Sequence, residues 1–123
     1  MWPDIEAALV AHLNGVLSVR VSTATPGDLE KLPGFVRVSR APGGDDGITD
    51  SPTVDVETFA PKRPAARDLA EEVRQAIHEL KGRRVEGLLF DVAETNVGPH
   101  WVDYRNPAVH RYVALYRFRY RKY

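Results

Sequence analysis

Apolar residues recur at helical spacing in two stretches of the chain. In residues 4–14 they define one face, and Asp4 stands where it can cap the N-terminus of a helix. In residues 64–81 they form a longer stripe, which opens with Pro64, a residue suited to the first helical turn. The two stripes consist of Ile5, Ala8, Leu9, His12, Leu13 and Val16, and of Ala66, Leu69, Ala70, Val73, Ile77 and Leu80.

Glycines mark the expected ends of both helices. Gly15 directly follows the helix predicted at 4–14 and Gly82 directly follows the one predicted at 64–81, and glycine is the residue that most often stands just beyond a helix C-terminus. On the outer face of the second helix, Arg67 and Glu71 are four residues apart, the spacing at which opposite charges pair.

Alternation of apolar and polar residues predicts five strands. They are expected at residues 16–22, 35–40, 53–59, 85–95 and 108–120, with a connection at 23–34, a flexible acidic loop at 41–47, a turn at 96–99 and an irregular stretch at 101–107. The order of elements is therefore α-β-β-β-α-β-β. It predicts a single α+β domain over residues 1–123, with a mainly antiparallel sheet and two helices packed on one face.

The last predicted strand separates aromatic from basic residues. Because successive side chains of a strand point to opposite faces, its aromatic and basic residues fall on different sides. Tyr112, Tyr116, Phe118 and Tyr120 share one face, and Arg111, Arg117, Arg119 and Arg121 share the other. The aromatic face is expected to complete the core. The arginine row is either a solvated face or a surface that meets something negative, such as a DNA backbone or the acidic residues of a neighbouring subunit.

A cluster of acidic residues precedes and enters the third predicted strand. It contains Asp45, Asp46, Asp50, Asp55 and Glu57. The spacing does not match the ordered ligand positions of a calcium-binding loop. Two interpretations remain, a solvated loop and an electrostatic contact with a basic partner.

The net charge of the chain helps to choose between nucleic acid and a neighbouring subunit as the partner of these charged residues. The chain has 123 residues, with 17 Lys and Arg against 17 Asp and Glu, so its formal net charge is zero. Binding of free nucleic acid by charge alone normally goes with a basic balance, which is absent here. A neutral chain with one acidic and one basic zone better suits head-to-tail self-association, which closes into a ring when the rotation permits. The acidic cluster, the four arginines and Lys122 are therefore the candidate subunit and partner interface.

Signatures of catalysis and of cofactor binding are missing from the sequence. There is no cysteine, no phosphate-binding glycine motif and no nucleophile elbow. The four histidines, His12, His78, His100 and His110, follow no metal-ligand spacing. We therefore expect no enzyme activity, no catalytic residues, no metal and no cofactor. The first residues contain no basic region followed by an apolar run, so we expect no signal peptide, and no apolar run approaches membrane-spanning length, so we expect no membrane segment.

Several segments together resemble the tail terminator proteins of long-tailed (siphovirus-type) phages, especially those that infect actinobacteria. They are LPGFVRV at 32–38, GGD at 43–45, TVDVETFA at 53–60, the helix at 65–80 and YVALYRFR at 112–119. The resemblance spans nearly the whole chain. It rests on patterns of strand, loop and helix and carries no catalytic signature.

The resemblance implies a location and a set of partners. Such proteins form a ring, expected to be hexameric, on the finished tail tube in the virion, after assembly in the host cytoplasm. The ring ends tube polymerisation, contacts the tail tube protein and offers a surface to the head-completion proteins, and DNA passes through its lumen without sequence-specific binding. The alternatives are a head-completion or stopper protein of the neck, and a nucleic-acid-binding module. We also expect residues 43–51 to reach out of the subunit and contact a neighbour.

Overall fold

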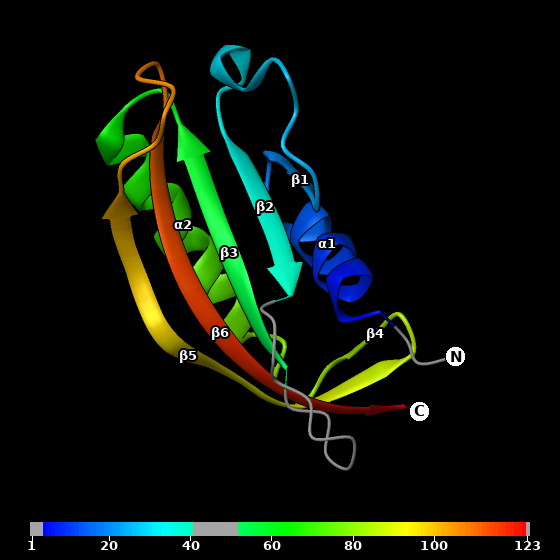
Figure 1. Cartoon of the computed structure of the whole chain (residues 1–123). Helices are drawn as coiled ribbons and strands as arrows, with labels where there is room; N and C mark the ends of the chain where they lie inside the picture. The colour runs from blue at the N-terminus through cyan, green and yellow to red at the C-terminus, as the bar shows by residue number, and fades with distance from the viewer. Residues whose placement is uncertain (1–3, 41–51, 123) are drawn as a thin grey trace.

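The computed structural model describes residues 4–40 and 52–122, which form a single α+β domain (Figure 1). Within these residues six strands form one sheet in the order β1-β2-β3-β6-β5-β4. Neighbouring strands run antiparallel except β1 and β2, which are parallel. The elements are α1 (Ile5–Val16), β1 (Arg20–Ser22), the 3₁₀ helix η1 (Leu29–Lys31), β2 (Phe35–Arg40), β3 (Thr53–Ala60), α2 (Arg63–His78), β4 (Arg84–Val85), β5 (Leu88–Val102) and β6 (His110–Lys122). The predicted fold class is confirmed, with one short strand, β4, added to the predicted order.

The first helix begins as predicted and ends later. The carboxylate of Asp4 accepts a hydrogen bond of 2.9 Å from the backbone N–H of Glu6, which caps α1. Gly15 does not end the helix, because the backbone N–H of Leu17 still donates to the carbonyl oxygen of Leu13 at 2.8 Å. Val16 therefore belongs to α1, and the strand predicted for 16–22 shrinks to β1.

The second helix ends earlier than predicted. Its apolar stripe is buried as expected, but α2 stops at His78, and a turn follows in which Leu80 remains buried. Gly82 lies in this turn with φ of +83°, a conformation that glycine adopts without steric cost. The predicted pair of Arg67 with Glu71 gives way to contacts of Arg67 with Asp68 at 3.6 Å and of Glu71 with Arg74 at 3.8 Å.

The predicted fourth strand was wrong at both ends. A turn at Glu86 and Gly87, both at positive φ, divides it and pairs β4 with the start of β5. The turn predicted at 96–99 is absent, and β5 continues through it to Val102. Register shifts near Val97 absorb the irregularity. Pro99 falls within the register shift between Val97 and His100, and among the described residues β5 has a neighbour there on one side alone, both of which favour proline in a strand.

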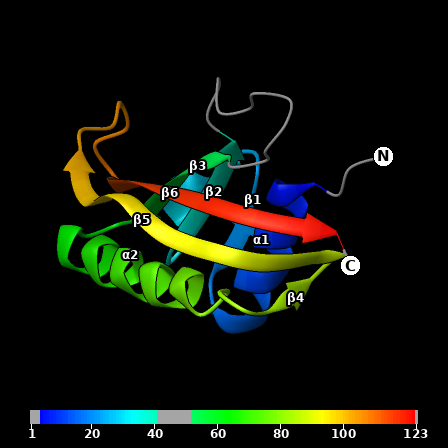
Figure 2. The same ribbon diagram turned by 90° about the horizontal axis from the view of Figure 1, so that it is seen from below.

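Both helices cover the same face of the sheet, as predicted. Figure 2 shows α1 and α2 on one side, with β5 and β6 curving over them. The main core lies between the helices and this face. Its contribution from β6 consists of Tyr112, Ala114, Tyr116, Phe118 and Tyr120, all buried, so the predicted aromatic face is confirmed.

A smaller apolar cluster lies on the other face of the sheet, at the end where β2 begins and β3 ends. It contains Leu29, Phe35, Phe59 and Val109, with Leu32 and Tyr104 packed against it. The rings of Phe59 and Tyr104 meet edge to face, with centroids 5.1 Å apart. This contact anchors the loop between β5 and β6 over the sheet, and so positions the polar residues around Tyr104.

Leu69→Ala should destabilise the domain by about 2–4 kcal/mol, because Leu69 is buried between α2 and the sheet and its removal leaves a cavity. Chemical denaturation monitored by circular dichroism measures the free energy of unfolding. Val16→Ala is the control, since Val16 is 49% exposed, and it should change stability by less than about 0.5 kcal/mol. Equal effects of the two substitutions would contradict the assigned core.

Candidate interaction surface

The arginines of β6 lie on the face of the sheet that carries no helix. Three of the four have acidic partners in the same chain. Arg117 donates through Nε to the Glu94 carboxylate at 2.7 Å, and Arg121 lies 3.5 Å from Asp91. Arg117 and Glu94 are half-exposed, so their pair contributes at most about 1 kcal/mol. Arg119 has no hydrogen bond or ion pair within the described part of the chain.

Arg111, the fourth arginine, belongs to a denser network. One carboxylate oxygen of Glu57 on β3 accepts a hydrogen bond of 3.1 Å from Arg111, and the other accepts one of 2.9 Å from Arg37 of β2. Arg111 also donates to the backbone oxygen of Asp103 at 2.8 Å, and its guanidinium lies 5.2 Å from the centre of the Tyr104 ring. Glu57 is only 13% exposed. The network therefore joins three strands and the loop that follows β5.

These residues surround an open depression of about 460 Å³. It is lined by Thr25, Arg37, Glu57, Phe59, Tyr104, Arg105 and Arg111. Three guanidinium groups face one carboxylate there, which leaves an excess of two positive charges. Arg105 is exposed and has no ion pair or hydrogen bond among the residues described, and the buried Nε of Arg111 has no acceptor. The site suits an anionic group and has an aromatic wall.

Of the residues at this site, the sequence pattern marked Arg111 and Glu57 and did not mark Arg37, Tyr104 and Arg105. Arg37 was detectable, because it alternates with buried valines on its strand and so faces the same side as Glu57. Tyr104 and Arg105 lie in a stretch without periodicity, and no pattern in the sequence marked them.

The remaining predicted interface residues lie elsewhere. Asp55 is on β3, opposite Ser39 and Leu115, and Lys122 ends β6. Asp45, Asp46 and Asp50, together with the predicted loop at 41–47 and the outreaching segment 43–51, lie outside the described residues. This part follows Arg40, the last residue of β2, and precedes β3, and in Figure 1 β2 ends and β3 begins at the lower end of the sheet. The depression is lined by Phe59, near the other end of β3, and by Tyr104 and Arg105 of the β5–β6 loop.

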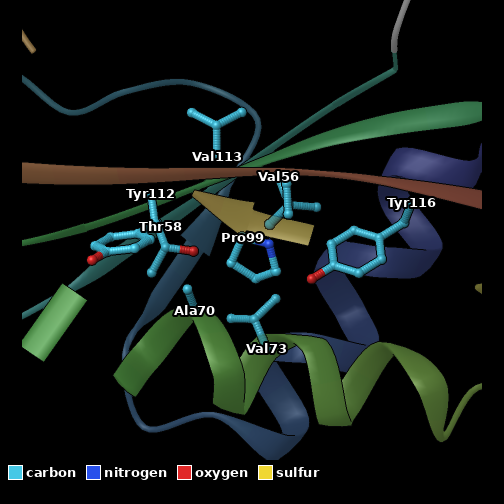
Figure 3. Close-up of a pocket in the computed structure, with 9 residues that line it drawn as sticks. Val56, Thr58, Ala70, Val73, Pro99, Tyr112, Val113 and Tyr116 are labelled. Carbon is cyan, nitrogen blue, oxygen red and sulfur yellow. The ribbon is translucent and has the colours of Figure 1, made fainter. Parts of the chain in front are cut away.

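A second, smaller pocket lies under the sheet, between α2 and the bend of β5 (Figure 3). It has about 150 Å³ of empty space and no room for a water molecule. Figure 3 shows the hydroxyl group of Tyr116 directed toward Pro99, above Val73. This hydroxyl is buried and has no hydrogen-bond partner among the described residues. Burial raises the pKa of Tyr116 to about 12, with Arg74 lowering it and Glu71 raising it to smaller extents. The pocket is a packing defect and does not suit a ligand.

The histidines are dispersed over the molecule. His12 lies 2.8 Å from the carbonyl oxygen of Ala76, and His78 lies 2.7 Å from the hydroxyl of Thr95. His110 accepts a hydrogen bond of 3.4 Å from the indole N–H of Trp101. In residues 4–40 and 52–122, no group of three or more His, Asp or Glu side chains could hold a metal ion. None of the helices described there combines the length and the apolar character needed to cross a bilayer.

Comparison with known proteins gives a structural match alone. No family model matches the sequence, and no curated protein matches it. Among solved structures, the chain resembles one from the "virion of native gene transfer agent (GTA) particle" with a TM-score of 0.61 and 13% sequence identity. The match covers 94% of this chain and 93% of the other. The two chains therefore share a fold over nearly their whole lengths.

Tyr116→Phe should leave the domain equally stable or stabilise it by up to about 1 kcal/mol, because it removes a buried hydroxyl that has no partner. It should also change the alkaline stability profile. An unfolded tyrosine loses its proton near its ordinary pKa of 10.0, whereas folded Tyr116 keeps it up to about 12. Folding stability therefore falls as the pH rises from 10 to 12.

Denaturation at several pH values, with ultraviolet absorbance of the phenolate, measures both effects. The variant should lose less stability over this range than the wild type. Tyr112→Phe is the matched control, since the hydroxyl of Tyr112 accepts a hydrogen bond of 3.5 Å from Arg63. A large loss of stability in Tyr116→Phe would show that its hydroxyl has a partner.

Glu57→Ala should destabilise the domain by about 1.5–3 kcal/mol, because two arginines lose their shared, mostly buried acceptor. Glu94→Ala removes an exposed acceptor and should cost less than about 1 kcal/mol. Urea denaturation of both variants gives the comparison. If Glu94→Ala is the more damaging substitution, the network around Glu57 does not hold the strands together.

Proposed function

We propose that this chain is a structural subunit of a phage-like virion, and specifically a tail terminator. The observation that carries the proposal is the shared fold with a chain of a gene transfer agent virion over 94% of this chain. The sequence resemblance to tail terminators at segments 32–38, 53–60 and 112–119 points the same way. Its subunits assemble into a hexameric ring that caps the tail tube, stops its polymerisation and presents a surface to the head-completion proteins.

The surface of the molecule supports a role in assembly. The larger of the two pockets described is an open depression on the sheet, whereas ligand sites for small molecules are usually concave and mostly enclosed. Charges are sorted along a chain of zero net charge, with Asp45, Asp46 and Asp50 in one segment and several arginines on the helix-free face. Complementary charges at subunit contacts set register and partner choice more than affinity. DNA traverses the lumen of the ring without sequence-specific contacts.

Particles assembled without this chain should carry tail tubes of excessive and variable length, because nothing ends their polymerisation. Electron microscopy of such particles measures tube length directly. In complete particles, averaging of the head-proximal end of the tail should reveal six copies of the chain. A stopper protein would give a different result, namely tails of normal length that fail to join heads. Absence of the chain from tails would refute the proposal.

A further inference from the structure

We propose that the depression between β2, β3, β6 and the β5–β6 loop binds the acidic segment 41–51 of a second copy of this chain. The contact joins different surfaces of two subunits. It rests on the proposed function, since it supplies the ring with a specific contact between neighbours. Its occupant is defined by chemistry, as carboxylates on a short protein segment.

The depression has more donors than acceptors. Glu57 accepts from both Arg37 and Arg111 and has one carboxylate to share between them. Arg105 adds a third guanidinium at the rim, which is exposed and has no partner among the described residues. Guanidinium groups bind carboxylates through paired hydrogen bonds, so the missing acceptor is most simply a carboxylate.

The geometry favours an acidic protein segment over nucleic acid. A DNA backbone presents charges in a long row and is held by several cations along one groove. Here the carboxylate of Glu57 lies in the lining and Asp103 is exposed nearby, so a continuous phosphate backbone would meet repulsion. A hollow of about 460 Å³ accommodates one or two acidic side chains, and Tyr104 offers their backbone an apolar wall.

The acidic segment of a second copy matches this site in charge and in place. Residues 41–51 contain three aspartates and no lysine or arginine. The flanking residues Arg40 and Pro52 lie at the end of β2 and beside the start of β3, and Phe35 and Phe59, at the other ends of these strands, lie toward the depression. Contact between unlike surfaces of identical subunits is heterologous, the type that closes into rings when the rotation permits.

Two variants that each lose one half of the contact provide the test. Arg105→Glu impairs the depression and keeps the acidic segment, whereas the double substitution Asp45→Asn and Asp46→Asn does the reverse. Sedimentation velocity at low salt should show concentration-dependent self-association of the wild type. The affinity of each variant for itself should be lower by at least about tenfold. An equimolar mixture should form a 1:1 complex, because one intact contact is restored and no further subunit can add.

Controls separate this contact from general charge effects and from misfolding. Lys81→Glu makes the same charge change as Arg105→Glu at an exposed position after α2, and it should associate like the wild type. Deletion of residues 43–51 should reproduce the aspartate variant while keeping the far-ultraviolet spectrum of the fold. High salt should weaken the wild-type complex.

Each alternative has its own outcome. A wild-type chain that stays monomeric at low salt, or variants that fail to combine, would overturn the proposed contact. Salt-sensitive binding of a short DNA duplex that Arg105→Glu abolishes would also overturn it, in favour of nucleic acid. Particle images separate this inference from the proposed function. Rings in which Arg105 faces away from the neighbour's acidic segment would refute the contact and leave the terminator role intact. If the mixed variants form the 1:1 complex but the chain never occurs on tails, the contact stands and the terminator role is refuted.

Discussion

The structure depends on the alternation of side chains along β6. This strand is bonded on both sides, to β3 and to β5, so its pleat sets the two faces of the sheet. Tyr116 and Phe118 enter the core beneath the helices, and Arg117 and Arg119 stand on the opposite face. A slip of one residue in register would bury the arginines and expose the aromatic rings. The cost of burying unpaired guanidinium groups therefore adds to the gain from burying the aromatic rings in fixing the register.

The charged face of the sheet is organised before any partner arrives. Glu57 holds Arg37 and Arg111 in place, and the carbonyl oxygen of Asp103 and the ring of Tyr104 restrain Arg111 further. Side chains that are already ordered lose little conformational entropy on binding, so a preformed arginine pair binds a carboxylate at lower cost than free side chains would. Glu57, which links β3 to β2 and β6, thus also holds the two guanidinium groups at the depression in place.

The sequence predicted the parts of the fold that depend on periodicity and missed those that depend on register. The α2 stripe and the aromatic face of β6 were predictable because burial repeats along each segment. The turn at Glu86 and Gly87 was missed because Val85 on one side and the apolar run 88–90 on the other were taken as one continuous strand. β5 continues through Gly98 and Pro99 with shifts of register, which a strand without a neighbour on its outer side accommodates.

The candidate site was predicted only in part, for the same reason. The pattern of β6 marked Arg111, but its partners come from other strands and from a loop. Arg37 reaches Glu57 because β2 and β3 pair them directly, and Tyr104 reaches Phe59 through a packing contact that no local pattern encodes. Of the acidic cluster, only Asp55 and Glu57 could be placed on the sheet.

Ion pairs within the chain weaken the interpretation of the β6 arginines as a DNA-binding strip. The row first suggests a basic strip for DNA, but Glu94, Asp91 and Glu57 neutralise three of its members. The positive excess is instead found at the depression, where the β5–β6 loop adds Arg105. A localised excess with a fixed shape selects a short acidic partner, whereas a continuous strip would attract any polyanion. If the proposed ring forms, neutralised arginines hold passing phosphates only weakly, and the localised charge remains for the proposed contact between subunits.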